Sequence, residues 1–174
     1  MTQKTQQQLV ELFDKATEIL QAALNCSYLD ALLENAENII DNNTVRVDDG
    51  VPDEKTVNEL QKIYQELNLQ NVKPEIIRQI IQLSFLKVIR KDAIQANHQM
   101  TPDTIGLIMA FLIEKVTKIK EIKTVFDPAV GTANLLTTVM NQLKVNGDKD
   151  IVGYGIDNDE DMLEVASVST ELQH

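Results

Sequence analysis

The spacing of apolar residues changes once along the chain, near residue 122, and this change limits the possible folds more than any other feature. Before it, apolar residues recur every three or four positions, which predicts amphipathic helices. After it, short β-branched runs at residues 122–126 and 151–156 alternate with two further helical segments. Strand, helix, strand and helix in this order predict a βαβ unit with a right-handed crossover. We therefore predict a mainly α N-terminal bundle followed by a parallel α/β segment.

The N-terminal part contains five predicted helices, and several begin at a recognisable start signal. Ser27 can cap the second helix, Asp53 opens the third after a proline, and Pro74 suits the first position of the fourth. The fourth helix is apolar over most of its circumference, so we expect it to lie at the centre of the bundle. A fifth helix is predicted over residues 105–119.

The α/β segment looks unfinished. Two parallel strands do not make a stable open sheet, because such sheets need more strands and helices on both faces. We expect the remaining strands to come from a missing C-terminal portion or from another chain, and we interpret the sequence as a fragment. The predicted domains are a helical one at residues 1–99 and the first part of an α/β domain at residues 100–174.

Composition narrows the class of protein. The 174 residues carry 27 acidic and 16 basic side chains, a formal net charge of −11, which argues against a surface that grips phosphates throughout. If the chain is a fragment, this charge does not exclude DNA as a substrate of the whole protein. A single cysteine fits a reducing cytoplasm, and no apolar run approaches the roughly 20 residues of a membrane span. We expect a cytoplasmic protein that does not contact membranes.

An acidic side chain follows each predicted strand. Asp127 ends the first strand and precedes a tight turn, Gly131 and a helix start, while Asp157 ends the second strand. Ligands of open α/β sheets bind outside such strand ends, so we predict a binding site there. The acidic run at residues 157–161 does not form a calcium loop, because Met162 stands where that loop needs glycine. We expect no metal site.

The charges at this site favour one cofactor. A dinucleotide normally requires several glycines near its pyrophosphate, but Ala133 occupies the next glycine position after Gly131. The Asp127 carboxylate would repel a pyrophosphate and attract an ammonium or sulfonium group. S-adenosylmethionine carries both groups and no phosphate, so we favour it over NAD and disfavour a dehydrogenase domain.

The segment Asp127-Pro128-Ala129-Val130-Gly131-Thr132-Ala133-Asn134 resembles the Asp-Pro-Ala-Cys-Gly-Thr-Gly-Asn cofactor motif of adenine-specific DNA methyltransferases. These are class I S-adenosylmethionine-dependent enzymes with a Rossmann-like domain, and the modification subunits of type I restriction systems are the most similar. Thr101-Pro102 is similar to the Thr-Pro element of that family, which lies against the methionine end of the cofactor. The family also has a helical region before the catalytic domain.

The resemblance implies a role for each matching position. Asp127 would face the methionine amino group, Asp157 would hold the ribose hydroxyls, and Asn158 would lie near the adenine ring. A methyl group at Ala133, where the family has glycine, is expected to crowd the cofactor or weaken its binding. The complete set of expected cofactor-binding residues is Thr101, Pro102, Asp127, Ala129, Gly131, Thr132, Asn134, Asp157 and Asn158.

The family's catalytic signature, Asn/Asp-Pro-Pro-Tyr/Phe, occurs nowhere in these 174 residues. That signature binds the target amino group and stacks the flipped base. We therefore assign no catalytic residue and expect the chain alone to be inactive, with the exocyclic amino group of adenine in DNA as the substrate of the whole protein. The alternative is a non-catalytic helical module with a degenerate α/β segment, which binds partner chains through its apolar helices. Exposed apolar helices or the unfinished sheet edge could also support a homo-oligomer.

Overall fold

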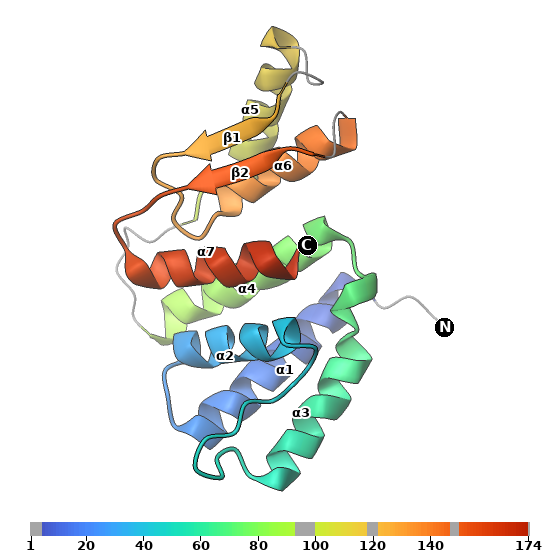
Figure 1. Cartoon of the computed structure of the whole chain (residues 1–174), viewed down its shortest axis with the longest axis vertical. Helices are drawn as coiled ribbons and strands as arrows, with labels where there is room; N and C mark the ends of the chain where they lie inside the picture. The colour runs from blue at the N-terminus through green and yellow to red at the C-terminus, as the bar shows by residue number, and fades with distance from the viewer. Residues whose placement is uncertain (1–4, 93–99, 118–121, 147–149, 174) are drawn as a thin grey trace. The chain divides into compact units, whose positions relative to one another are not determined.

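The computed structural model describes residues 5–92, 100–117, 122–146 and 150–173. The chain divides into two compact units, which we call the helical unit (residues 1–95 with 171–174) and the α/β unit (residues 96–170). Figure 1 shows their elements in chain order. They are α1 (Gln6–Leu24), α2 (Tyr28–Ile40), α3 (Glu54–Leu67), the short 3-10 helix η1 (Leu69–Asn71), α4 (Pro74–Lys91), α5 (Asp103–Val116), β1 (Thr124–Asp127), α6 (Asn134–Asn146), β2 (Val152–Gly155) and α7 (Glu160–Leu172).

Most of the predicted helix starts are confirmed. The Ser27 side chain caps α2 in a capping box with Asp30, and Asp53 caps α3 by accepting the Thr56 N–H at 2.8 Å. Pro74 is the first residue of α4. Helix α5 begins at Asp103, two residues before the predicted start, and Pro102 stands just before it with an extended ψ of 141° and no side-chain cap.

The helical unit is organised around α1, which packs against α2, α3 and α4. The prediction that α4 lies at the centre was wrong, because Leu83 and Leu86 on its outer side are each 41% exposed. The apolar stripe of α1 is narrower than that of α4, yet α1 is the helix that contacts three others. The hydrophobicity of a single helix therefore does not decide which helix lies at the centre of the bundle. One core cluster of this unit comprises Ala16, Leu20, Ala31, Val45, Leu60, Ile63 and Tyr64.

Polar contacts fasten the end of α4 to the start of α2. The Asp92 carboxylate accepts the backbone N–H groups of Tyr28 at 3.2 Å and Leu29 at 2.8 Å, which supplies partners for two unpaired donors at a helix start. The Tyr28 hydroxyl donates to Asp14, which also accepts from Lys87. Burial and the Asp14 contact raise the pKa of Tyr28, so this hydroxyl remains a proton donor at neutral pH.

The α/β unit contains a two-stranded parallel sheet in which Thr124, Val125, Phe126 and Asp127 pair with Val152, Gly153, Tyr154 and Gly155 in register. Helix α6 covers one face of this sheet, as Figure 1 shows. The core of the α/β unit comprises Ala110, Val130, Ala133, Leu136, Val139, Met140, Leu143, Ile151 and Ala166. The predicted strand-helix-strand-helix order is confirmed.

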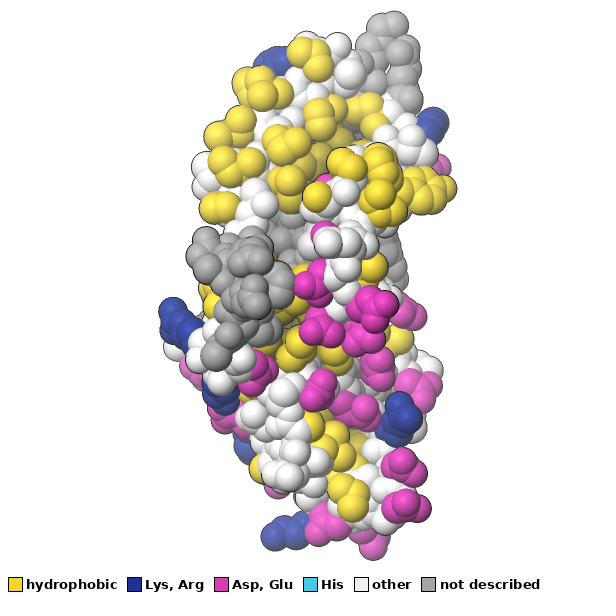
Figure 2. Space-filling model, turned by 90° about the vertical axis from the view of Figure 1, so that its left-hand side faces the viewer, with side chains coloured by type: hydrophobic (Ala, Val, Ile, Leu, Met, Phe, Trp, Pro, Cys, Tyr) yellow, Lys and Arg dark blue, Asp and Glu magenta, His cyan; other side chains and the backbone are white. Residues whose placement is uncertain are grey.

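Hydrophobic and acidic side chains occupy different parts of the surface. Figure 2 shows hydrophobic side chains gathered over part of the α/β unit, and acidic side chains lie elsewhere on the same face. None of the helices in the described ranges is long and apolar enough to cross a membrane.

Candidate functional site

A cavity of about 450 Å³ lies within the α/β unit, where β1 and β2 end. Three segments form its wall: the residues before α5, the turn between β1 and α6, and the turn between β2 and α7. Its position outside the carboxyl ends of parallel strands is the usual place for a ligand in an α/β sheet. The lining residues are Met100, Thr101, Ala129, Val130, Gly131, Thr132, Asn134, Leu135, Asp157, Asn158, Asp159 and Met162.

The turn after β1 is held by backbone geometry and by the strand next to it. The Asp127 carboxylate accepts the Ala129 N–H at 3.0 Å, and the Val130 N–H donates to the Ile156 carbonyl at 2.9 Å. Gly131 then takes a φ of 50°, in the left-handed region that glycine adopts most readily. These bonds turn the backbone so that the amide of Gly131 points toward the next strand's end.

Asp157 joins the two turns. One carboxylate oxygen, Oδ2, accepts the Gly131 N–H at 2.7 Å, across 26 residues of sequence. The other oxygen, Oδ1, accepts the N–H groups of Asn158 at 2.8 Å and Asp159 at 3.1 Å. Charge-assisted bonds of this kind are stronger than neutral ones, so Asp157 positions both turns as well as lining the cavity.

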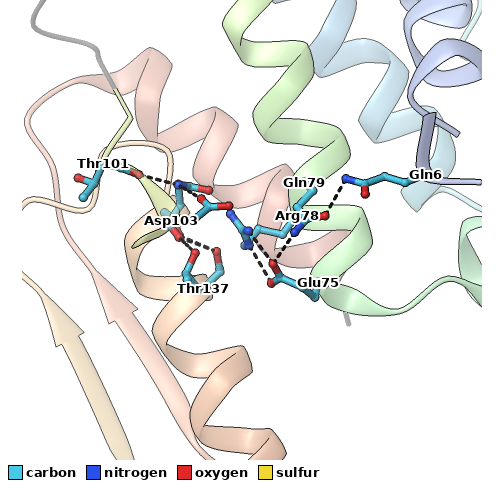
Figure 3. Close-up of polar contacts among 10 residues, drawn as sticks. Gln6, Glu75, Arg78, Gln79, Thr101, Asp103 and Thr137 are labelled. Carbon is cyan, nitrogen blue, oxygen red and sulfur yellow. Dashed lines mark hydrogen bonds and ion pairs between the residues drawn. The ribbon is translucent and has the colours of Figure 1, made fainter. Parts of the chain in front are cut away.

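Asn134, at the start of α6, joins the segment before α5 to the turn after β1. Its Nδ2 donates to the Thr101 carbonyl at 2.9 Å and to the Asp103 carboxylate at 3.3 Å. Figure 3 shows these contacts from the start of α6 to the segment that leads into α5. The same view also draws contacts of the helical unit, where Glu75 pairs with the buried Arg78 and Gln6 donates to Gln79.

Two glycines allow the close packing behind the cavity. A methyl group at Gly106 would lie 2.7 Å from Thr138 Cγ2, so the absence of a side chain lets α5 approach α6. A methyl group at Gly155 would lie 2.5 to 2.9 Å from three carbons of Val130. Both contacts set the distance between the wall segments, and larger residues would separate them.

The structure brings together seven of the nine expected cofactor-binding residues: Thr101, Ala129, Gly131, Thr132, Asn134, Asp157 and Asn158. The other two do not line the cavity in the described part of the chain. Asp127 is half-buried and turns its carboxylate back to Ala129, and Pro102 precedes α5.

Ala133 also differs from the expectation. Its side chain is 1% exposed and belongs to the core rather than to the cavity lining, so its methyl group points away from the space where we expected it to crowd a cofactor. The backbone φ of 59° at Ala133 explains why glycine suits this position in the family motif.

Sequence reasoning missed five lining residues, namely Met100, Val130, Leu135, Asp159 and Met162. Most of them adjoin predicted site residues, so neighbourhood in the sequence is a signal that could have found them. Met162 required knowing where α7 begins, because it reaches the cavity from the first turn of that helix.

Residues 7–89, which lie in the helical unit, match the family model described as the YtxK N-terminal helical domain. The uncharacterized protein YtxK of Bacillus subtilis is 35% identical over 162 residues, which cover 93% of this chain and 47% of that protein.

A crystal structure from Listeria monocytogenes, described as that of a candidate class I S-adenosylmethionine-dependent methyltransferase, is similar at a TM-score of 0.83 and 42% identity. The match covers 97% of this chain and 50% of that protein. The predicted fold, a helical bundle followed by an α/β segment of the class I methyltransferase type, agrees with this neighbour. The chain spans about half the length of each of these two relatives.

Proposed function

We propose that the α/β unit binds S-adenosylmethionine in the strand-end cavity and that the chain is part of a methyltransferase. The observation that carries the proposal is the Asp157 carboxylate, which lines the cavity while it holds the Gly131 turn. The similarity to the Listeria protein supports the same assignment.

The lining residues suit this cofactor in size and in charge. A cavity of about 450 Å³ lies in the usual range of roughly 300–1,000 Å³ for small-molecule sites. Among the described lining residues there are two carboxylates, Asp157 and Asp159, and no Lys or Arg. Carboxylates in the lining repel a pyrophosphate, whereas they do not oppose a ligand that carries a positive sulfonium and an ammonium group. This charge pattern argues against NAD.

Each wall segment would make a different contact. Asp157 would accept the ribose hydroxyls, Asn158 would lie beside the adenine ring, and the turn from Ala129 to Thr132 would pack against the ligand. Thr101, held by Asn134, would lie at the methionine end. The cofactor supplies an electrophilic methyl group on its sulfonium when it is bound.

The finer proposal concerns the acceptor. The resemblance of residues 127–134 to adenine-specific DNA methyltransferases supports the exocyclic amino group of adenine in DNA as the methyl acceptor. The Asn/Asp-Pro-Pro-Tyr/Phe signature is absent from the 174 residues, so the acceptor site would have to lie outside them. The chain alone is then expected to bind the cofactor without transferring its methyl group.

Binding can be tested by following backbone amide NMR signals during a titration with S-adenosylmethionine, a method that also detects weak binding. We expect shifts at residues 129–132 and 157–159, a weaker response in Asp157→Asn, and an unchanged one in Asp161→Asn, an exposed acid outside the cavity. NAD should leave these signals in place.

No shift at millimolar S-adenosylmethionine, or equal affinity for NAD, would refute the site assignment. Either result would favour the alternative function, a non-catalytic helical module that binds partner chains. Equal responses of the two variants would show that the ligand does not contact Asp157.

A further inference from the structure

Helix α6 begins at the cavity without a capping side chain. Its first residue is Asn134, so Ala133 stands at the N-cap position, where Ser, Thr, Asp or Asn normally accepts an N–H of the first turn. An alanine side chain cannot accept a hydrogen bond. In the described part of the chain, no group accepts the N–H of Leu135 or of Leu136. Such donors, at the positive end of a helix dipole, favour a negative group.

The Thr132 side chain lies next to this helix start and is 8% exposed, and Thr132 lines the cavity. Two nearby hydroxyls are paired: Thr137 donates to the Ala133 carbonyl at 2.7 Å, and Thr138 to the Asn134 carbonyl at 2.7 Å. The Thr132 hydroxyl has no such partner among the described residues. The described side-chain atoms that are both fully enclosed and unpaired all belong to the helical unit. The Thr132 hydroxyl therefore reaches open space, and the space that Thr132 borders is the cavity.

The proposed cofactor carries one group that the rest of the lining does not suit. S-adenosylmethionine ends in an amino acid, whose carboxylate is negative at neutral pH. Asp157 and Asp159 would repel this group, and the described lining residues include no Lys or Arg that could pair with it. Uncharged donors at a helix start are what the described lining offers to an anion.

We propose that the Thr132 hydroxyl and the first N–H groups of α6 bind the carboxylate at the amino-acid end of the cofactor. This inference rests on the proposed function and adds the recognition of one chemical group. Asn134 supports the assignment, because its side chain holds the Thr101 segment, the proposed methionine end, to the start of α6 at 2.9 Å. A Cβ atom at Gly131 would meet nothing within 4 Å, so a ligand can approach the backbone before Thr132.

The test compares S-adenosylmethionine with its decarboxylated form, which keeps the sulfonium and the ammonium group and lacks only the carboxylate. Amide NMR titrations of the 174-residue chain give a dissociation constant for each ligand. Hydrogen bonds to a charged group are worth about tenfold or more in affinity. We therefore expect S-adenosylmethionine to bind at least about tenfold more tightly than the decarboxylated form.

Variants at Thr132 identify the hydroxyl as a cause of this preference. Thr132→Val keeps the shape of the side chain and should reduce the preference to a few-fold at most, without weakening the decarboxylated ligand. Thr132→Ser keeps the hydroxyl and should retain the preference. Thr170→Val is the matched control, because the Thr170 hydroxyl donates to the Ala166 carbonyl at 2.9 Å within α7 and does not line the cavity. Circular dichroism checks that each variant is folded.

Equal binding of the two ligands by the unmodified chain would overturn the carboxylate site and leave the proposed function intact. A preference that survives in Thr132→Val would do the same. So would a loss of preference in Thr101→Val alone, which would place the carboxylate at the segment before α5. If S-adenosylmethionine caused no shifts at all, the proposed function would fail, and this inference with it.

Discussion

Gly155 lies at the end of β2, against Val130 of the turn after β1, and its replacement by alanine tests how tightly the site is packed. The new methyl carbon would lie 2.5, 2.7 and 2.9 Å from Val130 Cγ2, Cβ and Cγ1, against about 3.5–4.0 Å for an ordinary contact. Rotating the valine exchanges its two methyl groups but leaves Cβ in place. The turn itself must therefore move, although its Val130 N–H is bonded to the Ile156 carbonyl.

The expected cost follows from these contacts. Gly155 itself is exposed, but the new methyl group would press against the buried Val130. Overpacking against a buried side chain costs about 1–3 kcal/mol, and the smaller unfolded-state entropy of alanine returns about 0.4–1 kcal/mol. The net loss for Gly155→Ala is therefore about 1–2 kcal/mol. For a unit of this size, that lowers the melting temperature by roughly 5–15 °C. Thermal and urea unfolding followed by circular dichroism would measure it.

Gly153→Ala is the matched control, because it lies two residues earlier in the same strand. Its nearest neighbour would be the Met140 Sδ at 2.4 Å, the far part of a flexible side chain that can move aside. We expect a loss below about 1 kcal/mol. If Gly153→Ala destabilised the protein as much as Gly155→Ala, the argument from the rigidity of the neighbour would be wrong.

Three further perturbations test other contacts. Asp92→Ala removes the acceptor for two N–H groups at the start of α2 and should cost about 1–2 kcal/mol in urea unfolding, with Asp92→Asn losing less. Asn134→Ala should lower the free energy of unfolding by about 1–2 kcal/mol, since it removes the bond to Thr101, and should weaken S-adenosylmethionine binding in the NMR titration. Burial raises the pKa of Glu34 in the folded protein, so ionisation of this carboxyl destabilises the folded state at a pH above the raised pKa. The effect disappears at a pH below the pKa of the unfolded chain, because the carboxyl is then protonated in both states. Glu34→Gln should therefore raise the melting temperature near pH 7, and the gain should vanish at about pH 3.5.

The sequence predicted the order of elements because each leaves a local signal. Periodicity marked each α-helix but not the short 3-10 helix η1, and the caps at Ser27 and Asp53 depend only on nearby residues. The place of α4 in its bundle was not predictable in this way. Its hydrophobicity suggested a central helix, but which neighbours surround a helix depends on contacts far apart in the sequence.

The position of the cavity was also predictable from local signals, but the directions of its side chains were not. Strand ends and turn residues are local features, so Gly131 and Asp157 were found from the sequence pattern, whereas Thr101 was implied by the family resemblance. The structure places all three around one space. The direction of a side chain depends on backbone angles that the sequence does not state. The left-handed φ at Ala133 directs its methyl group into the core. The hydrogen bond from the Ala129 N–H keeps the Asp127 carboxylate against the backbone of the turn after β1.

The position of Asp127 changes what its substitution can show. Its carboxylate accepts the Ala129 N–H within the turn that leads to Gly131, and it does not line the cavity among the described residues. A loss of cofactor affinity in Asp127→Ala would therefore follow from a displaced turn, and the amide signals of residues 129–131 would shift before any ligand is added. If those signals kept their positions while affinity fell, Asp127 would have to reach the ligand directly, as the family resemblance implies. The signals of the free protein thus separate a positioning role from direct binding.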